Sequence, residues 1–427
     1  MINTPISIII PSHNRATSLK RLLDKLGTQS YPTLLMQVIV VADGCKDHTI
    51  SMLKDYTSDF KLDYIEMPGS GAAIARNKGA GLAVHPILLF LDDDIDPSED
   101  LVKAHVEEHA IENRVVIGYL PLAISKKPDF YHLTLLAWWE EKFQQMSSRG
   151  YRFNYEDLIS GNFSIGHNLF KKVNGFDTSF RCREDYELGM RLIKSNAEFI
   201  FSKKAWGYHR DEVTNLDRSL VRKRDEGKAD IQFWKSHPDM PTYIQNLYNT
   251  HRYTFLNSKY MFFIIHMPAI TDQFAKALRQ IMSILETLKL RKQWKRISRK
   301  LQIYWYTKGI LDELHNKKNL DGYLNFELTG KAEEEEFVID LEKGLQQAEQ
   351  LLDENRPSNI RVRYGYQEIG IVPSKPGFEK LSGKHLRKLL ATDLALPLMK
   401  SLAFNMISSD NGKINIEDYQ NEKVLKN

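Results

Sequence analysis

The strongest constraint on the fold is a short apolar segment that ends in acidic residues. Residues 86–91 form an apolar run, and Asp92, Asp93 and Asp94 follow it at once, with Asp96 close behind. Such a run is typical of a strand buried inside a parallel sheet. Ligand sites in open α/β sheets lie at the carboxyl ends of strands, and divalent cations such as Mg²⁺ or Mn²⁺ prefer oxygen ligands. The segment therefore indicates a cation site at a strand end or, taken alone, a solvated acidic turn.

The segments on either side of this run alternate between strand and helix patterns. Apolar and β-branched runs predict strands at residues 6–10, 38–41, 62–65, 115–119, 158–165 and 199–201. Helical patterns fall at residues 17–26, 46–56, 72–83, 99–110, 132–146 and 183–192. This alternation is typical of βαβ units, so we expect an α/β fold with a mostly parallel sheet. The loop at residues 69–71 fits either a phosphate-binding turn or, more simply, a tight turn before a helix.

Composition places the chain among globular proteins of a reducing compartment. Its 427 residues are 42% apolar, which is enough for a large core. On a prior of roughly 150 residues per domain, that length allows about two to three domains. Two cysteines, Cys45 and Cys182, cannot form a disulfide framework. The N-terminus has no basic region followed by an apolar one, and the best apolar run, 261–265, is too short to span a bilayer. We therefore expect a cytoplasmic protein.

Six motifs in order resemble those of the family 2 glycosyltransferases. They occupy residues 11–15, 40–44, 90–94, 161–163, 174–177 and 183–188, and the resemblance covers about residues 5–215. Each motif is weak by itself, but all six occur in the family's order with ordinary spacings. The resemblance implies a GT-A fold, a nucleotide-sugar donor, a divalent metal and inversion at the anomeric carbon.

The resemblance also implies which residues bind the donor and the metal. Donor-binding roles fall, from nucleoside to diphosphate, on Pro11, His13, Arg15, Asp43, Asp92, Asp93 and Arg76. Arg76 lies one helical turn beyond the 69–71 loop, and a plain surface arginine is the alternative. Asp94 would hold Mg²⁺ or Mn²⁺ directly, with His209 completing the site, although a lone histidine after a strand is usually structural.

On the acceptor side, the resemblance makes Asp185 the catalytic base. The neighbouring Glu184 would help at the acceptor or cap the helix, and acids in a first turn also suit the helix dipole without any catalytic role. Acceptor contacts are implied for Gly161, Asn162 and Trp206. An acceptor hydroxyl is a poor nucleophile at neutral pH, so a carboxylate must take its proton during attack. A cation would stabilise the charge that gathers on the leaving diphosphate.

Two departures from the family pattern concern the nucleoside pocket. Ala42 stands where the first of two aspartates is usual, and His13 replaces a common aromatic residue. These changes weaken any inference about the base, and uridine diphosphate is the family default. We expect a metal-dependent inverting glycosyltransferase of cell-surface polysaccharide synthesis, acting on a glycan or lipid-linked acceptor. One rival is a non-catalytic sugar-nucleotide-binding scaffold. Another is a nucleotidyltransferase, which would need a Gly-rich loop after the first strand.

The basic residues gather in one part of the second half. Residues 276–308 carry ten Lys or Arg against one Glu, whereas the whole chain has a net charge of only +4. A charged helix at 216–234, interrupted near Gly227, precedes this segment. Phe274, Leu278, Ile281, Leu285 and Leu288 then form an apolar helical stripe, followed by basic residues between 291 and 300. Residues 274–308 therefore fit an anionic membrane surface on the inner face of the cell membrane or a helix packed on the catalytic domain. A nucleic-acid patch is the least favoured alternative, and we expect no nucleic-acid partner.

The last hundred residues predict a small accessory domain. A helix is expected to start at residues 333–336, followed by a hairpin of strands at 360–364 and 369–372 and a helix at 385–404. The final twenty or so residues are polar and are expected to be loose. We expect a catalytic domain at 1–215, a helical basic extension at 216–325 and an α+β accessory domain at 326–427. The oligomeric state and the role of the accessory domain stay open.

Overall fold

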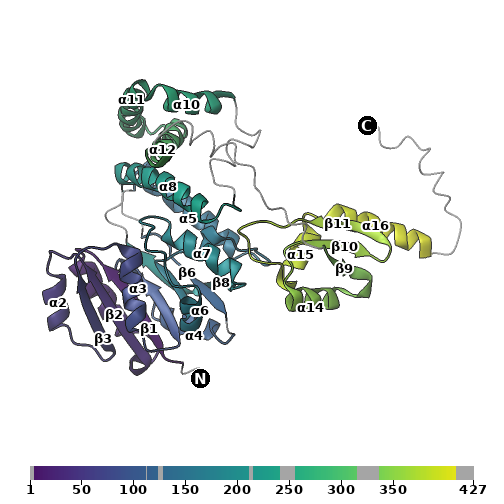
Figure 1. The fold of residues 1–427 in the computed structure, drawn as a ribbon, viewed down its shortest axis with the longest axis horizontal. Helices are drawn as coiled ribbons and strands as arrows, with labels where there is room; N and C mark the ends of the chain where they lie inside the picture. The colour runs from purple at the N-terminus through teal and green to yellow at the C-terminus, as the bar shows by residue number, and fades with distance from the viewer. Residues whose placement is uncertain are drawn as a thin grey trace. The chain divides into compact units, whose positions relative to one another are not determined.

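The computed structural model describes residues 4–111, 113–123, 128–210, 215–240, 255–314 and 336–409. The chain divides into two compact units, which are described separately below (Figure 1). The first comprises Met1–Ser147, Phe153–Lys331 and Pro376–Glu379, and the second comprises Ser148–Arg152, Ala332–Lys375 and Lys380–Asn427. The expected loose tail at 410–427 lies outside the described residues.

A mixed, mostly parallel sheet forms the centre of the first unit. Among the described residues it has eight strands in the order β3-β2-β1-β4-β7-β6-β8-β5. The strands are β1 (Ile6–Ser12), β2 (Met36–Asp43), β3 (Lys61–Met67), β4 (Ile87–Leu91), β5 (Ile95–Pro97), β6 (Arg114–Tyr119), β7 (Asn162–Gly166) and β8 (Glu198–His209). The pairs among β1 to β4 and the pair β6–β8 are parallel. β7 is antiparallel to β4 and β6, and β5 is antiparallel to β8.

Helices pack around this sheet, and the alternating pattern predicts all of those named next except the one at His167–Lys172. They are α1 (Ala16–Leu26), α2 (Thr49–Asp55), α3 (Ala72–Leu82), α4 (Leu101–Glu108), α6 (His167–Lys172) and α7 (Glu184–Lys194), with 3₁₀ turns η1 (Thr33–Leu35) and η2 (Tyr155–Asp157). The buried leucines of α1 and the strands β1, β2 and β4 share one apolar core. Phe90 on β4 stacks on Phe163 of β7 with 4.8 Å between ring centroids, which ties the antiparallel part to the parallel part. The predicted α/β fold is therefore confirmed.

Two strand boundaries differ from the sequence-based expectation. The strand expected at 158–165 begins only at Asn162, because η2 and a turn occupy the residues before it. The strand expected at 199–201 is the 12-residue β8, which runs on to His209. Its second half carries Lys203, Lys204 and other polar or exposed side chains that hide the strand from an apolar-run criterion. This extension brings His209 back beside β5.

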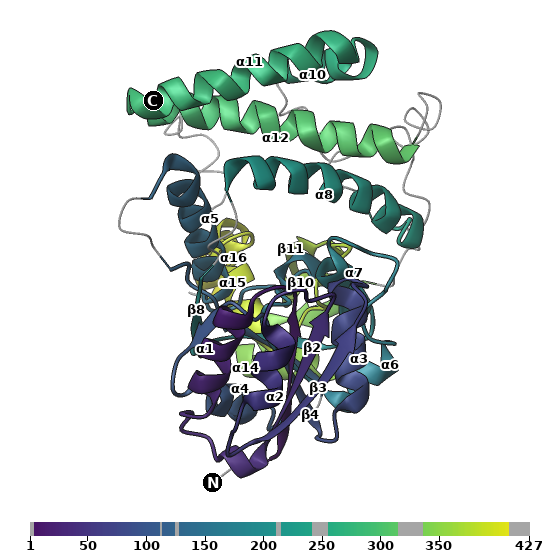
Figure 2. The ribbon, with the colours of Figure 1, turned by 90° about the vertical axis from the view of Figure 1, so that its left-hand side faces the viewer.

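Helices that stack on one another form the rest of the first unit (Figure 2). They are α5 (Phe130–Met146), α8 (Leu216–Ser236), α10 (Phe255–His266), α11 (Pro268–Thr287) and α12 (Arg291–Leu314). α8 is continuous, so the expected interruption near Gly227 is wrong. A Cβ on Gly227 would lie 2.2 Å from the carbonyl oxygen of Tyr306, and one on Gly309 would lie 1.9 Å from that of Arg224. The glycines therefore allow the backbones of α8 and α12 to touch. Within the described ranges, none of the helices is both long enough and apolar enough to cross a bilayer.

The second unit is a small α+β assembly with a core of its own. Its strands are β9 (Phe337–Asp340), β10 (Ile360–Tyr364) and β11 (Gln367–Val372), and its helices are α14 (Leu345–Asn355), α15 (Gly383–Ala391) and α16 (Ala395–Ser409), with η3 at Leu341–Lys343. The β10–β11 hairpin is confirmed. The helix expected from 333–336 to before Pro357 is wrong at its start, because Phe337–Asp340 pair with β10 as a strand, but its later part is the helix α14. The helix expected at 385–404 is two helices.

Candidate active site

The three aspartates that follow β4 lie at the carboxyl end of the sheet beside the loop after β1. Ser12 donates a 2.6 Å hydrogen bond to Asp93, and Arg15 contacts both Asp93, at 3.1 Å, and Asp94. β1 and β4 are adjacent parallel strands, so their ends meet at the same edge. The structure thus brings together three of the predicted donor-side and metal residues. Pro11 is half-buried at the end of β1.

Burial and ion pairing act in opposite directions on these two carboxyl groups. Burial raises the pKa of Asp93 to about 6, despite the hydrogen bond from Ser12 and the charge of Arg15. Burial also acts to raise the pKa of Asp94, but His209 and Arg15 outweigh it and hold that pKa below its ordinary value. At neutral pH both groups are therefore ionised, and Asp94 is the more firmly so.

His209 and Asp94 face each other, as the predicted metal site requires. The imidazole Nε2 lies 3.4 Å from Asp94 Oδ1, an oxygen that is buried without a hydrogen-bond partner. Strand pairing sets this geometry, because β5 pairs with the end of β8 and Arg210 donates its backbone N–H to the Asp94 carbonyl at 3.0 Å. Arg210 also makes two hydrogen bonds, of 3.1 and 2.9 Å, to Asp96.

This donor pair fits a divalent cation that takes its remaining ligands from a bound phosphate. A carboxylate oxygen and an imidazole nitrogen suit Mn²⁺ or Mg²⁺, and Mg²⁺ is commonly bound by one or two carboxylates plus substrate phosphates. Among the described residues no group of three or more His, Cys, Asp or Glu side chains forms a complete protein cage. The residues present therefore suit a metal that arrives with, or is completed by, a phosphorylated ligand.

Arg76 joins the strand-end acids to the helix that carries the predicted base. Its Nη2 donates to Asp92 at 2.8 Å and its Nη1 to Glu184 at 2.9 Å, while the guanidinium lies 5.6 Å from the Phe176 ring centroid. Only 4% of Arg76 is exposed. The surface-arginine alternative is therefore wrong, because the guanidinium is buried and shared between two carboxylates. The diphosphate contact stays a prediction.

Asp185 stands in the first turn of α7, next to Glu184. It is half-buried, and its Oδ1 accepts the backbone N–H of Tyr186 at 2.9 Å. Burial and the neighbouring negative charge of Glu184 raise the pKa of Asp185 to about 6. A carboxylate with a raised pKa that is still ionised at neutral pH has the properties required of a general base.

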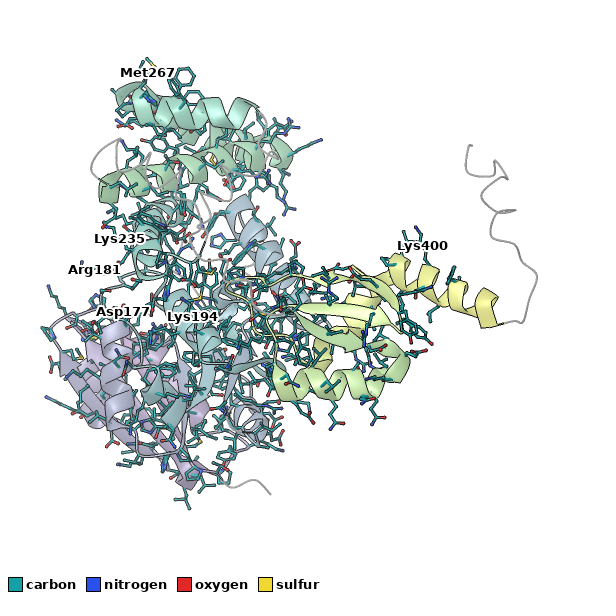
Figure 3. All side chains as sticks on the ribbon, turned by 45° about the vertical axis from the view of Figure 1, so that its right-hand side comes forward. Asp177, Arg181, Lys194, Lys235, Met267 and Lys400 are labelled. Carbon is teal, nitrogen blue, oxygen red and sulfur yellow. The ribbon has the colours of Figure 1, made fainter. Side chains whose placement is uncertain are left out.

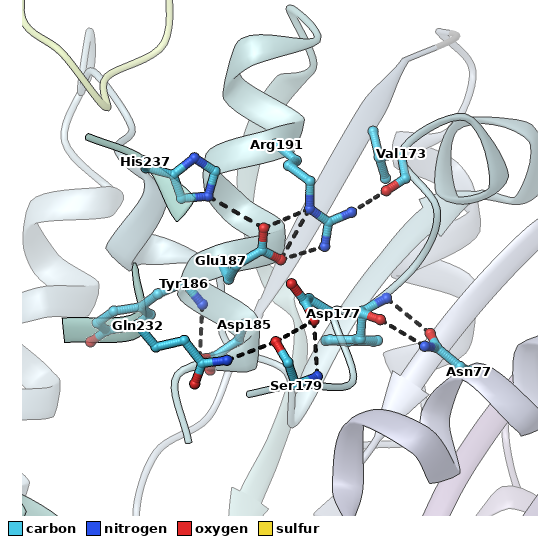
Figure 4. A network of polar contacts seen from close by, with 11 residues as sticks. Asn77, Val173, Asp177, Ser179, Asp185, Tyr186, Glu187, Arg191, Gln232 and His237 are labelled. Atoms are coloured by element: carbon cyan, nitrogen blue, oxygen red, sulfur yellow. Dashed lines mark hydrogen bonds and ion pairs between the residues drawn. The ribbon is translucent and has the colours of Figure 1, made fainter. Parts of the chain in front are cut away.

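A polar network holds the start of α7 in place (Figure 4). Buried Glu187 pairs with Arg191, which also donates to the Val173 carbonyl, and His237 approaches Glu187 at 3.3 Å. Asn77 on α3 makes two hydrogen bonds to the backbone of Phe176, in the loop between α6 and α7. The helix that presents Asp185 is thus fixed from both sides.

The Asp43 side chain faces inward to the 69–71 loop, whereas His13 is open to solvent. The Asp43 carboxylate accepts three backbone N–H groups, from Gly69 at 3.1 Å and from Ser70 and Gly71 at 2.7 Å each. The 69–71 loop is therefore a tight turn whose N–H groups are already occupied, and it is no phosphate cradle. His13 is exposed, and its Nδ1 lies 2.5 Å from the Asp43 carbonyl oxygen.

The predicted acceptor residues separate into a buried pair and a more open one. Asn162 is fully buried, accepts from His105 at 2.8 Å and donates to the Ala205 carbonyl at 2.9 Å, so a direct acceptor contact by this side chain is wrong. Gly161 leaves no room for a side chain, because a Cβ there would lie 2.7 Å from Asp92 Oδ2. Trp206 is half-buried on β8, edge-on to Tyr208.

Sequence reasoning missed two features near the site. Ser164 joins His105 and His109 by contacts of 2.8 Å each, a buried network behind Asn162 that no motif indicates. Arg222 on α8 is exposed, and its positive charge acts against the rise in the pKa of Asp185. The helical pattern of 216–234 was visible in the sequence, but nothing in it placed this arginine beside a residue 37 positions earlier.

Two family models match overlapping parts of the chain, and both describe glycosyltransferases. Residues 7–173 match the model of glycosyl transferase family 2, and residues 141–213 match a model described as N-terminal domain of galactosyltransferase. The chain is 30% identical over 268 residues to validoxylamine A glucosyltransferase of Streptomyces hygroscopicus subsp. jinggangensis, covering 55% of this chain and 61% of the relative. It is 27% identical over 229 residues to glycosyltransferase GlyA of Streptococcus pneumoniae, covering 52% of this chain and 31% of that relative.

The chain therefore spans about three fifths of the length of the first relative and less of the second. Among solved structures, a mannosyltransferase of Pyrobaculum calidifontis in complex with GDP-Man and Mn²⁺ superposes with a TM-score of 0.50 at 16% identity, over 73% of this chain and 88% of that one. This likeness concerns the fold, and it confirms the predicted GT-A architecture.

Proposed function

Because residues 7–173 match the model of glycosyl transferase family 2, we propose that this chain transfers a sugar from a nucleoside diphosphate sugar to an acceptor hydroxyl. The donor nucleotide is uridine diphosphate, and the acceptor is a glycan or a lipid-linked sugar of cell-surface polysaccharide synthesis. Transfer proceeds with inversion and needs Mg²⁺ or Mn²⁺. Residues 1–215 carry the catalytic domain, 216–325 the helical extension and 326–427 an accessory domain. The protein works in the cytoplasm, at the inner face of the membrane.

The observation that carries this proposal is the bridge made by Arg76. One guanidinium contacts Asp92 at 2.8 Å and Glu184 at 2.9 Å. Asp92 begins the acidic strand end, and Glu184 precedes the half-buried Asp185. Asp92, at the proposed donor site, and Asp185, the proposed base, are 93 residues apart in sequence. Arg76 holds the strand end and the start of α7 close to each other. A transferase needs this proximity, because donor and acceptor must meet in one pocket.

In the proposed reaction, Asp185 takes the proton of the acceptor hydroxyl as its oxygen attacks the anomeric carbon. The new carbon–oxygen bond forms on the face opposite the leaving nucleoside diphosphate, whose bond to the same carbon breaks with both electrons. A single displacement of this kind inverts the anomeric configuration. Its raised pKa of about 6 leaves Asp185 ionised at neutral pH yet basic enough to share the proton in the transition state.

The other site residues bind the metal or position their neighbours, and they form no bond to the substrates. Asp94 and His209 would bind the divalent cation, which when present neutralises charge on the leaving diphosphate. Ser12 and Arg15 hold Asp93 and Asp94 at the strand end. Glu184 is tied to Arg76, so its part is to position the start of α7 and to raise the pKa of Asp185 by its charge.

Calorimetric titration with a panel of nucleoside diphosphates tests the donor site. Titrations with Mn²⁺ and with chelator are compared for the wild type, for Asp94→Ala and for Asp239→Ala. Asp239 pairs with Lys194 on an exposed surface, so its variant is the matched control. We expect tight binding of one nucleotide that needs Mn²⁺ and is lost in Asp94→Ala alone.

Two outcomes would contradict the proposal. Nucleotide binding that is equally tight with chelator, or in Asp94→Ala, would show that Asp94 does not bind a metal needed for donor binding. No binding of any nucleotide to the folded wild type would favour a non-catalytic scaffold that has kept the fold.

A further inference from the structure

The outer face of α11 carries a row of large apolar side chains that are open to solvent. The spacing from Met267 to Leu288 is that of one helical face, in steps of three, four or seven residues. The row consists of Met267, Ile270, Phe274, Ile281, Ile284 and Leu288, each between 40% and 60% exposed. Met267 lies at the outer edge of the helical stack (Figure 3). Exposed rows of apolar side chains of this length are typical of surfaces that bind another protein, a membrane or a ligand.

This row is not needed to pack the helix. A different face of α11 contributes Ala275, Leu278 and Met282 to a core shared with Trp294 and Leu301 of α12. The sequence-based stripe is therefore two faces, because Leu278 is buried while Phe274, Ile281 and Leu288 are exposed. Packing on neighbouring helices and contact with an outside partner were offered as alternatives. In the structure, one side of the helix packs on α12 and another side is open to solvent.

The turn into α12 adds a block of positive charge directly after this row. Residues 289–300 contain Lys289, Arg291, Lys292, Lys295, Arg296, Arg299 and Lys300 and no acidic residue. All seven are exposed, and none forms an ion pair within the described part of the chain. Two other cations of the same helices are paired, Arg279 with Asp217 and Lys308 with Asp272. The seven charges at the α11–α12 turn thus have no counter-charge within the described part of the chain.

We propose that the row and these seven cations together form a surface, here called the hairpin surface, that lies on an anionic lipid bilayer. Apolar side chains would enter the boundary between headgroups and acyl chains, and the cations would meet anionic headgroups. At the α11–α12 turn, apolar and cationic residues alternate along the chain, in the order Leu288, Lys289, Leu290 and Arg291. Both kinds of contact are therefore offered by four consecutive residues. This inference rests on α11 and α12 alone and does not depend on the transferase activity.

Charge and apolarity together favour a bilayer over other partners. A second copy of the chain would bring its own seven unpaired cations to the same interface, where like charges repel. Nucleic acid would satisfy the cations, but it would leave the Ile, Phe and Leu side chains of the row without a matching surface. An anionic bilayer matches both the cations and the apolar row.

Co-sedimentation with vesicles tests the hairpin surface on the full chain. Vesicles of phosphatidylcholine with phosphatidylglycerol are compared with vesicles of phosphatidylcholine alone. One variant changes Arg291, Lys292, Lys295 and Arg296 to Gln, and a second changes Ile270, Phe274, Ile281 and Ile284 to Gln. The control changes four other exposed lysines, Lys25, Lys54, Lys171 and Lys172, to Gln.

We expect the wild type and the control to bind only the anionic vesicles, and raised salt to weaken that binding. At about 1 kcal/mol per surface cation, the cation variant should lose roughly 10²- to 10³-fold in partitioning. The apolar variant should lose binding to a similar extent, and circular dichroism should show that both variants keep their helices.

Three results would overturn the inference. The first is equal loss of binding in the control variant, which would indicate nonspecific charge attraction. The second is an oligomer in the absence of lipid that the apolar variant converts to monomer, which would assign the row to a second copy. The third is binding of the wild type to neither kind of vesicle.

Discussion

The strand-end site and the hairpin surface both contain many charged residues. Those of the strand-end site form ion pairs within the protein, whereas those of the hairpin surface do not within its described part. At the strand end, Asp92, Asp93 and Asp94 are each paired with an arginine, and two of the three are buried. On the hairpin surface, seven exposed cations have no ion-pair partner in the described part of the chain. Charges that are paired internally hold a geometry, whereas unpaired charges of one sign are available to an external counter-charge.

The comparison also separates what each region contributes to stability. Removing one partner of a buried pair leaves an uncompensated charge in a medium of low dielectric constant, which is costly. Removing an exposed, unpaired cation leaves nothing behind and relieves repulsion between neighbours. The predictions that follow test this contrast in order of decreasing expected effect.

The largest effect is expected for the substitution Asp185→Asn. Loss of a general base lowers turnover by roughly 10²- to 10⁴-fold. Donor affinity should stay close to that of the wild type, because the proposed reaction has Asp185 act on the acceptor and not on the donor. Steady-state kinetics and calorimetry on the same preparation measure the two quantities. Near-normal turnover would show that another group takes the proton.

Replacing the bridging arginine should affect folding as well as activity. Arg76→Met leaves Asp92 and Glu184 without their shared partner, and we expect a loss of about 2–4 kcal/mol in the free energy of unfolding. The matched control is Arg279→Met, which breaks the exposed pair with Asp217 and should cost at most about 1 kcal/mol. Urea denaturation compares them, and equal losses would contradict the structural role of the bridge.

The pH dependence of turnover should follow the raised pKa of Asp185. A base must be deprotonated to act, so turnover is expected to be half-maximal near pH 6, to level off well above it and to fall below it. Well below the pKa the loss approaches roughly tenfold per pH unit. Asp93 also titrates near 6, but it would act on donor affinity. Turnover at saturating donor separates the two, and a profile flat down to pH 4.5 would exclude Asp185.

The smallest effect is expected for the hairpin surface. Changing Arg291, Lys292, Lys295 and Arg296 to Gln should alter the free energy of unfolding by no more than about 0.5 kcal/mol per substitution, because these side chains are exposed and unpaired. Thermal and urea denaturation in the absence of lipid measure this. A loss of several kcal/mol would mean that the cations support the fold.

The sequence allowed the fold class and the acid cluster to be predicted because both depend on local patterns. A buried run that ends in aspartates specifies a strand and its carboxyl end without any knowledge of distant residues. The pairing of Asp94 with His209 was also predicted, but only through family resemblance. The physical cause is the pairing of β5 with the end of β8, and a three-residue strand leaves almost no signal in sequence.

The errors in prediction share a cause, which is that orientation depends on tertiary contacts. Arg76 looked available from its position on α3, but the folded chain turns it inward between Asp92 and Glu184. Asn162 looked like an acceptor ligand, but His105 from α4 holds it within the core. Gly227 looked like a break in a helix, and it is instead the place where another helix touches α8.

The most direct test of the proposed site is the anomeric configuration of the first product. Water can take the place of the acceptor hydroxyl in this reaction, so no acceptor has to be known. Proton NMR follows the sugar released from the donor identified by calorimetry, in the wild type and in Asp185→Asn. Attack assisted by Asp185 opposite the leaving diphosphate predicts that the inverted anomer appears first and that Asp185→Asn releases far less of it. Release of the retained anomer, or equal release by the variant, would contradict the account.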